Sequence, residues 1–193
     1  MISHRLGHRL DPWFKGLFSK LDSWRIRPDH LTVVGAISSL PAILLFGHGT
    51  SPWAGIALLA SGFFDLLDGA FARMQGKVTA FGGFLDSVLD RYVDLGVLAG
   101  IAYRYGTIDD DALLVLTLIT MVGTALVPYS RARAELIVPR CSIGIAERPE
   151  RIIILAAGNI LNVLPTAMLI LAVITHVTTL QRINYAKRKS SKP

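Results

Sequence analysis

The chain has 193 residues, of which 52% are hydrophobic and only 18% are charged, and its mean hydropathy is +0.49. A soluble domain of this length needs a wetted polar surface and cannot carry such hydropathy, which also excludes a disordered or collagen-like chain. The formal net charge of +6 arises from 20 Lys and Arg against 14 Asp and Glu, an excess that is typical of the cytoplasmic loops of a membrane protein, so no nucleic-acid partner is expected.

Residues 1–27 are predicted to form an amphipathic helix. Apolar side chains recur there at helical spacing from Leu6 to Trp24, and basic side chains such as Arg5 and Lys15 fall between them. Such a helix lies in the headgroup layer of a membrane, with its apolar face toward the acyl chains. We expect it at the cytoplasmic surface. The alternative is a helix that packs against a soluble element.

Six membrane-spanning helices are predicted between residues 28 and 186. A helix needs about 20 mainly apolar residues to cross the hydrocarbon core. The candidate spans are residues 31–47, 52–71, 82–103, 112–129, 145–162 and 165–183. The last two spans share one long uncharged run, 152–180, which exceeds a single ordinary crossing. We expect a tight turn at Asn159, Asn162 and Pro165 to split this run.

The basic residues predict the orientation of these spans. If both termini are cytoplasmic, all basic residues except Arg91 and Arg104 lie in cytoplasmic segments, as the positive-inside rule requires. Five spans would instead place the basic tail 187–193 outside the cell. The sequence therefore predicts an all-α, multi-pass protein of the cytoplasmic membrane, with a six-helix domain over 28–186 and a cytoplasmic tail over 187–193.

Four carboxylates interrupt the second and third predicted spans. Asp65 and Asp68 are three residues apart and Asp86 and Asp90 are four apart, so each pair shares one face of a helix. Charges inside spans are costly and indicate function by default. Two antiparallel helices would bring both faces together near the cytoplasmic surface, where four carboxylates ionise only with cations between them. Oxygen-only ligands favour two Mg²⁺ or Mn²⁺ ions, which together could hold a diphosphate.

The aspartates belong to a longer pattern, Asp65-x2-Asp68-Gly69-x2-Ala72-Arg73-x8-Gly82-x3-Asp86-x3-Asp90. At every position this pattern resembles the signature of the CDP-alcohol phosphotransferase family, and the six-helix layout with an amphipathic N-terminus is similar to that family. The resemblance implies an enzyme that exchanges the CMP of a CDP-linked lipid or alcohol for another alcohol. A structural Asp–Arg network that braces two helices is the alternative, but it would explain one or two carboxylates rather than four.

The resemblance also implies a role for each residue of the pattern. Asp65, Asp68 and Asp86 are expected to bind the metal ions; Asp90 is expected near the second ion and as the general base for the incoming hydroxyl. The residues expected to bind the CDP moiety are Asp68, Gly69, Ala72, Arg73 and Thr32. Members of the family are commonly homodimers, so a homodimer in contact with membrane lipids is expected.

A cluster of basic residues indicates what kind of acceptor alcohol would bind. Five arginines near the cytoplasmic interface are candidates to bind a phosphate: Arg131, Arg133, Arg148, Arg151 and Arg182. Converging arginines bind a dianionic phosphate bidentately, so the predicted acceptor is a phosphorylated polyol. For any single arginine, contact with lipid headgroups is the alternative. Asp94 lies one turn beyond the aspartate pattern and is expected either to support the site or to pair with Arg91 or another interior group.

The stretches 131–135 and 144–151 are similar to the phosphatidylinositol phosphate synthase branch of the family and its archaeal ether-lipid relatives. This similarity implies transfer of a phosphatidyl-type group from CDP-diacylglycerol, or its archaeal equivalent, to inositol 1-phosphate, with release of CMP on the cytoplasmic side. Two other hypotheses stay open: a phosphatidylglycerophosphate synthase that uses glycerol 3-phosphate, and a cation transporter that uses the intramembrane aspartates.

Overall fold

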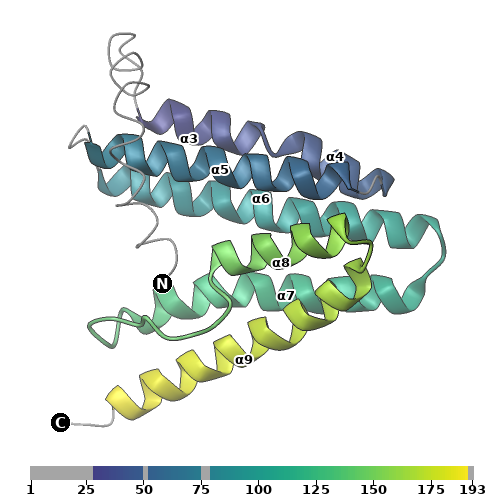
Figure 1. The fold of residues 1–193 in the computed structure, drawn as a ribbon. Helices are drawn as coiled ribbons and strands as arrows, with labels where there is room; N and C mark the ends of the chain where they lie inside the picture. Colours follow the sequence, from purple (N-terminus) through teal and green to yellow (C-terminus); the bar gives the residue numbers. More distant parts are fainter. Residues whose placement is uncertain (1–27, 50–51, 75–78, 191–193) are drawn as a thin grey trace.

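The structure is a computed structural model that describes residues 28–49, 52–74 and 79–190 (Figure 1). Within these ranges every regular element is an α-helix, which confirms the predicted all-α class. The helices are α3 (Pro28–Ile37), α4 (Leu40–His48), α5 (Trp53–Met74), α6 (Ala80–Thr107), α7 (Asp111–Ala134), α8 (Arg148–Ile160) and α9 (Leu164–Ser190). The predicted amphipathic helix 1–27 and the end of the tail, 191–193, lie outside the described residues.

The helices pack as two connected groups. In Figure 1, α3 and α4 run along α5 and α6, while α9 lies beside both α7 and α8. Helix α6 packs against α7, and α8 packs against both α5 and α9, so the two groups share one interior. Its core is built from buried apolar side chains of α4, α5, α6, α8 and α9, among them Phe46, Val97, Ile101, Leu155 and Met168.

The first predicted span, 31–47, is helical but consists of two helices. Helix α3 ends at Ile37, and α4 begins at Leu40 with Pro41 in its first turn. Pro41 has no N–H to bond the carbonyl four residues earlier, and its ring would clash with that carbonyl, so one continuous helix is disfavoured. Ser38 and Ser39 make the break, each donating its hydroxyl to a backbone carbonyl of α3 at 2.6 Å.

The predicted turn in the run 152–180 is present between α8 and α9. Asn162 adopts a positive φ of 58°, and the Val163 N–H donates to the Gly158 carbonyl at 2.8 Å. The Asn159 carbonyl takes part in this turn by accepting the Asn162 N–H at 3.1 Å, but its side chain has a different role. It is buried in α8, and its Oδ1 accepts the Gly55 N–H of α5 at 2.8 Å. That N–H belongs to the first turn of α5, where backbone donors lack partners within the helix.

Two described helices are long and apolar enough to cross a membrane, Asp111–Ala134 and Leu164–Ser190, and shorter apolar helical stretches cover Thr32–His48 and Trp53–Asp65. Helix α8 is shorter than the predicted span 145–162 at both ends, because it begins at Arg148 and ends at Ile160. Pro149 lies in its first turn, the part of a helix that tolerates a residue without an N–H. Its 13 residues extend about 20 Å, less than the roughly 30 Å hydrocarbon core.

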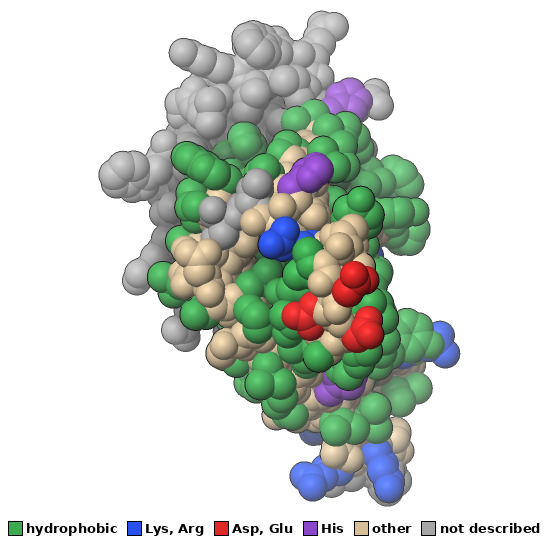
Figure 2. Space-filling view, turned by 90° about the vertical axis from the view of Figure 1, so that its right-hand side faces the viewer, with side chains coloured by type: hydrophobic (Ala, Val, Ile, Leu, Met, Phe, Trp, Pro, Cys, Tyr) green, Lys and Arg blue, Asp and Glu red, His purple; other side chains and the backbone are tan. Residues whose placement is uncertain are grey.

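The molecular surface is mostly apolar. Figure 2 shows hydrophobic side chains over much of one face, with a small group of acidic side chains together. Large exposed apolar residues follow the outer faces of the longest apolar helices, including Leu118, Ile119 and Val122 of α7 and Ile170 and Val173 of α9. Contiguous apolar surface of this kind marks contact with lipid or with another protein.

Candidate active site

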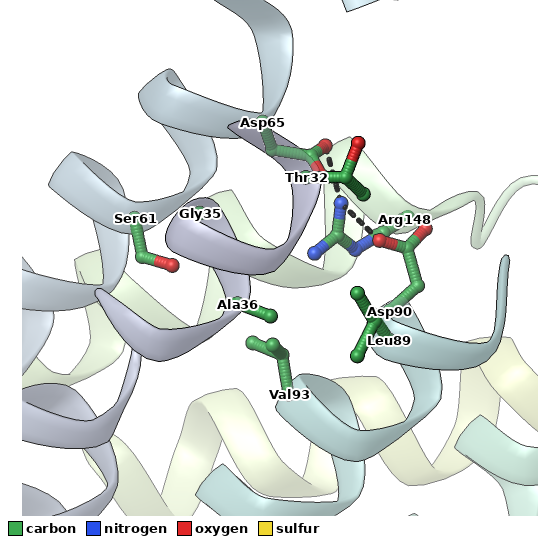
Figure 3. A pocket seen from close by; sticks show the side chains of 9 residues that line it. All are labelled: Thr32, Gly35, Ala36, Ser61, Asp65, Leu89, Asp90, Val93 and Arg148. Atoms are coloured by element: carbon green, nitrogen blue, oxygen red, sulfur yellow. Dashed lines mark hydrogen bonds and ion pairs between the residues drawn. The ribbon is translucent and has the colours of Figure 1, made fainter. Parts of the chain in front are cut away.

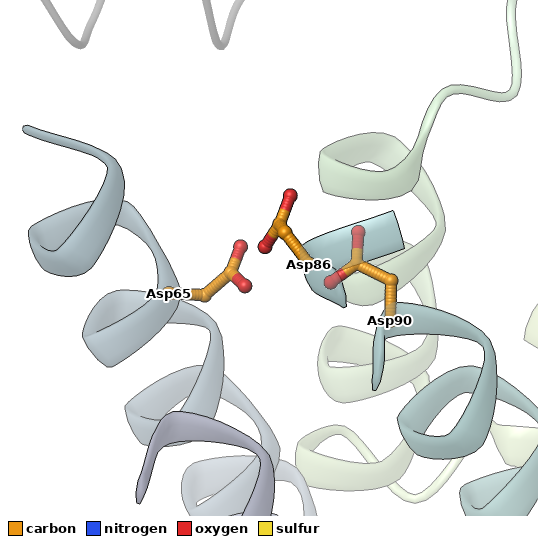
Figure 4. A group of neighbouring side chains, drawn as sticks. All are labelled: Asp65, Asp86 and Asp90. Atoms are coloured by element: carbon orange, nitrogen blue, oxygen red, sulfur yellow. The ribbon is translucent and has the colours of Figure 1, made fainter. Parts of the chain in front are cut away.

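Three of the four predicted metal ligands converge. Asp65 of α5 and Asp86 and Asp90 of α6 each offer a carboxylate oxygen, and these oxygens lie within 4.8 Å of one another (Figure 4). Asp86 and Asp90 are four residues apart and therefore face the same side of α6. Helix α3 packs against both α5 and α6 and places the two helices on either side of the cluster.

Arg148, at the start of α8, supplies positive charge to this cluster. Its Nη1 donates a hydrogen bond to Oδ2 of Asp65 and lies 2.8 Å from Oδ1 of Asp90. Figure 3 shows the guanidinium between the two carboxylates, facing Thr32. The Arg148 side chain is only 15% exposed. One guanidinium group thus links α5, α6 and α8 at the site.

A small pocket surrounds these groups. It is lined by Thr32, Gly35 and Ala36 of α3, Ser61 and Asp65 of α5, Leu89, Asp90 and Val93 of α6, and Arg148 of α8. Its wall is polar at the carboxylates and apolar on the side of Ala36, Leu89 and Val93 (Figure 3). A ligand with a charged group and an apolar portion could therefore meet complementary surfaces here.

Asp94 connects the pocket to a second layer of charge. Its side chain is 6% exposed and accepts a hydrogen bond from Nη2 of Arg151. Nε of Arg148 lies 3.5 Å from Oδ1 of Asp94, and Nη2 of Arg91 lies 3.9 Å from Oδ2. Asp94 is therefore paired with Arg91, which is one of the alternatives left open by the sequence, and also with two arginines of α8. Nη1 of Arg151 completes the network with a 2.9 Å bond to the Ala146 carbonyl.

The remaining arginines lie in the last turn of α7 and in the C-terminal half of α9. Arg182 is 2% exposed; its Nε donates to the Ile143 carbonyl at 2.9 Å and its Nη1 donates to the Val127 carbonyl. Arg131 and Arg151 are close enough to Arg182 for their charges to act on it. Four of the five predicted arginines therefore gather near the start of α8. The fifth, Arg133, is exposed and makes no ion pair within the described part of the chain.

Arg131 is oriented by two glutamates. Its Nε donates to Oε1 of Glu135 at 3.1 Å, and its Nη1 lies 3.8 Å from Oε1 of Glu147. Partial burial alone would raise the pKa of Glu135, but hydrogen bonds from Arg131 and the Cys141 N–H lower this pKa overall. Glu135 thus stays ionised near neutral pH and holds Arg131 in place.

Of the predicted site residues, the structure brings Thr32, Asp65, Asp86, Asp90 and Arg148 to one place. The predicted residues Asp68, Gly69, Ala72 and Arg73 belong to α5, but their side chains lie outside the described part of the structure. The sequence reasoning missed Ser61, which lines the same pocket. Its position one helical turn before Asp65 could have revealed it, because residues four apart share a helix face.

Comparisons with known proteins show which family the chain resembles along most of its length. A family model described as CDP-alcohol phosphatidyltransferase matches residues 25–181. The archaetidylinositol phosphate synthase of Pyrococcus horikoshii is 41% identical over 170 residues, which cover 88% of each chain. Two crystal structures of phosphatidylinositol phosphate synthase from Mycobacterium tuberculosis are similar at 32% identity. The one with CDP-DAG bound has a TM-score of 0.82 and covers 89% of this chain and 92% of its own. The one in complex with manganese and citrate has a TM-score of 0.83 and covers 89% and 88%.

Proposed function

Because the chain belongs to the CDP-alcohol phosphatidyltransferase family, we propose that it transfers a phosphatidyl-type group from a CDP-linked lipid to inositol 1-phosphate and releases CMP. The observation that carries this proposal is the Asp65, Asp86 and Asp90 cluster beside Arg148. Relatives named archaetidylinositol and phosphatidylinositol phosphate synthases support the acceptor, and a solved relative with CDP-DAG bound supports the lipid donor.

The aspartates are the residues that would hold two divalent cations, Mg²⁺ or Mn²⁺. Asp65, Asp86 and Asp90 fit this role because they offer oxygen ligands only, within 4.8 Å of one another, and such ligands suit these hard cations. We assign Asp68 to the same set from the sequence pattern. Bound there, the cations would neutralise the diphosphate and polarise the phosphoryl group under attack. A relative solved with manganese and citrate is consistent with this assignment.

Asp90 is the proposed general base. Its Oδ1 is held by Arg148 at 2.8 Å, while its Oδ2 lies 3.7 Å from Arg91 and is the atom that would take the proton of the acceptor hydroxyl. An alcohol is a weak acid, so its attack requires such a base beside the reacting phosphoryl group. The deprotonated oxygen would then form the new phosphoester bond as the bond to CMP breaks.

The CDP moiety is assigned to Thr32, which lines the pocket, and to Asp68, Gly69, Ala72 and Arg73 of the α5 pattern. The acceptor phosphate is assigned to Arg131, Arg148, Arg151 and Arg182, which the fold gathers at the start of α8. Arg133 stays a prediction from the sequence. Guanidinium groups that converge from three helices can bind a phosphate through several charge-assisted hydrogen bonds.

The proposed setting is the cytoplasmic membrane, with six helical crossings, both termini in the cytoplasm, and the site facing the cytoplasm. The distribution of basic residues and the apolar outer surface of the helices support this placement. Residues 1–27 are assigned to an interfacial helix and 187–193 to a basic tail. A homodimer is proposed from the family resemblance.

CMP release is the experiment that tests the function. Purified protein with Mg²⁺ and CDP-diacylglycerol, or its archaeal ether-linked equivalent, is supplied with inositol 1-phosphate, glycerol 3-phosphate or serine. We expect release with inositol 1-phosphate and a loss of about 100-fold or more in Asp90→Asn. The exposed Asp109→Asn serves as the matched control. Release with glycerol 3-phosphate alone would identify the alternative acceptor, and no release with any acceptor would refute the enzymatic proposal.

A further inference from the structure

Arg148 uses the same carboxylates that a metal ion needs. Its Nη1 bonds Asp65 and lies 2.8 Å from Asp90, and these two residues are part of the oxygen cluster described above. A divalent cation such as Mg²⁺ binds carboxylate oxygens at about 2.0–2.1 Å. A guanidinium group in hydrogen-bond contact with both carboxylates and a cation bonded to the same oxygens would compete for one space and one set of lone pairs.

The charge balance of the cluster leads to the same conclusion. Three carboxylates whose oxygens lie within 4.8 Å repel one another unless a cation lies between them. In this structure Arg148 is the cation in direct contact with two of them. A divalent cation would supply the same compensation, and the bonds between Arg148 and the two aspartates would then no longer be required.

Asp94 offers Arg148 a second position. Nε of Arg148 lies 3.5 Å from Oδ1 of Asp94, and this Nε is buried without a hydrogen-bond partner in the structure. A small movement of the guanidinium away from Asp65 and Asp90 would turn this loose ion pair into a hydrogen bond. Asp94 is itself held by Arg151, so it is a fixed acceptor rather than a mobile one.

We propose that Arg148 and a divalent cation are alternative occupants of the Asp65 and Asp90 carboxylates, and that metal binding displaces the Arg148 guanidinium toward Asp94. This inference rests on the proposed function, since it takes the cluster to be a metal site. It also bears on how Arg148 would serve an acceptor phosphate, because Nη1 faces both carboxylates in this structure and the displacement would free its N–H groups. Because the two occupants exclude each other, the free energy with which Arg148 binds the aspartates lowers the apparent affinity of the site for a metal ion by the same amount.

A Mn²⁺ titration of the full-length protein in detergent tests the displacement. The electron paramagnetic resonance signal of free Mn²⁺ gives the affinity of the wild type, Arg148→Gln and Arg151→Gln. Both variants lose one positive charge, but Arg151 contacts Asp94 and the Ala146 carbonyl rather than Asp65 or Asp90. Arg151→Gln therefore measures the general effect of removing a charge. We expect Arg148→Gln to bind Mn²⁺ at least about fivefold more tightly than Arg151→Gln, because coupling energies of 1–3 kcal/mol correspond to about 5- to 150-fold.

Two further variants keep the test decisive. Arg148→Lys retains the charge but cannot bridge two carboxylates with a planar fork, so its affinity for Mn²⁺ is expected between those of the wild type and Arg148→Gln. It replaces Arg148→Gln if that variant does not fold. Asp86→Asn identifies the metal site itself. If the wild type binds Mn²⁺ no better than Asp86→Asn, the metal site and the proposed function both fail. If it binds Mn²⁺ but Arg148→Gln binds no more tightly than Arg151→Gln, or Arg148→Lys binds no more tightly than the wild type, only the displacement is overturned.

Discussion

Replacing Asp94 by Asn should loosen the contact between α6 and α8. Asp94 is 6% exposed and is paired with Arg151, whose side chain is also 6% exposed. The amide keeps the shape of the side chain and one acceptor oxygen. It removes the negative charge that compensates the positive charge of Arg151 and part of the positive charge of Arg148. Breaking a buried ion pair by removing one partner costs about 3–5 kcal/mol, because the other charge stays buried without compensation.

We therefore expect Asp94→Asn to lower the free energy of unfolding by about 3 kcal/mol, the lower end of that range, since one hydrogen-bond acceptor is kept. For a chain of this size a loss of that magnitude lowers the melting temperature by about 6–12 °C. A thiol-reactive fluorescent dye can follow the melting of the protein in detergent, because the single cysteine, Cys141, is buried in the fold. The matched control is Asp109→Asn, an identical change at an exposed residue, which should stay within about 0.5 kcal/mol of the wild type.

A double variant shows whether the loss of stability comes from the broken ion pair or from a packing defect. In Asp94→Asn/Arg151→Met the uncompensated guanidinium is also removed, so the loss of stability should be smaller than the sum of the two single losses by about 1 kcal/mol or more. The reasoning is refuted if Asp94→Asn melts no lower than Asp109→Asn, or if the two single losses simply add in the double variant.

Three further outcomes are expected. Thr79→Ala should destabilise the protein by about 1 kcal/mol, because the Thr79 hydroxyl caps α6 by accepting the Gly82 N–H at 2.9 Å, whereas Thr79→Ser keeps the cap; chemical denaturation measures both. Gly55→Ala should lower the free energy of unfolding by about 1–3 kcal/mol in the same experiment, because the new Cβ would lie 2.6 Å from the Ala156 carbonyl oxygen. The control is Gly106→Ala, whose new Cβ meets nothing within 4 Å, so this change should be neutral or stabilising. Chelation by EDTA should abolish CMP release, and Mg²⁺ or Mn²⁺ should restore it; activity that persists in EDTA would contradict the metal assignment.

Local sequence signals predicted most of the helices, and the differences have local physical causes. The spans predicted at 82–103 and 112–129 lie inside α6 and α7, and the span predicted at 52–71 lies in α5 except for Pro52. Mainly apolar runs of this length favour helices, because a helix satisfies all of its backbone hydrogen bonds within the segment. The split of the first span at Pro41 could have been anticipated from the missing N–H. Asn159 could not be assigned from its own neighbourhood, since its role depends on Gly55, which is 104 positions away in the chain.

The carboxylates of the site were predictable and the partners of the arginines were not. Asp86 and Asp90 share a face by helical periodicity alone, and the signature spacing adds Asp65 from the neighbouring helix. Arg148 and Arg151 were predicted near the site, but their bonds to Asp65 and Asp94 depend on how α8 packs against α5 and α6. An arginine side chain is long and flexible, so its partner is chosen by tertiary packing rather than by sequence spacing.

Helix α8 shows why the charged residues lie where they do. Its 13 residues are too few to span the hydrocarbon core, so hydrophobic matching alone does not define its depth in the fold. Polar contacts hold it at both ends: Arg148 and Arg151 bind the aspartates at its start, and Asn159 accepts the Gly55 N–H at its end. Each is strengthened by a medium of low dielectric constant, where an unpaired polar group is costly. The active-site charges thus also determine the position of the helix that carries the arginines, and a change in their compensation, such as metal binding, acts directly on that helix.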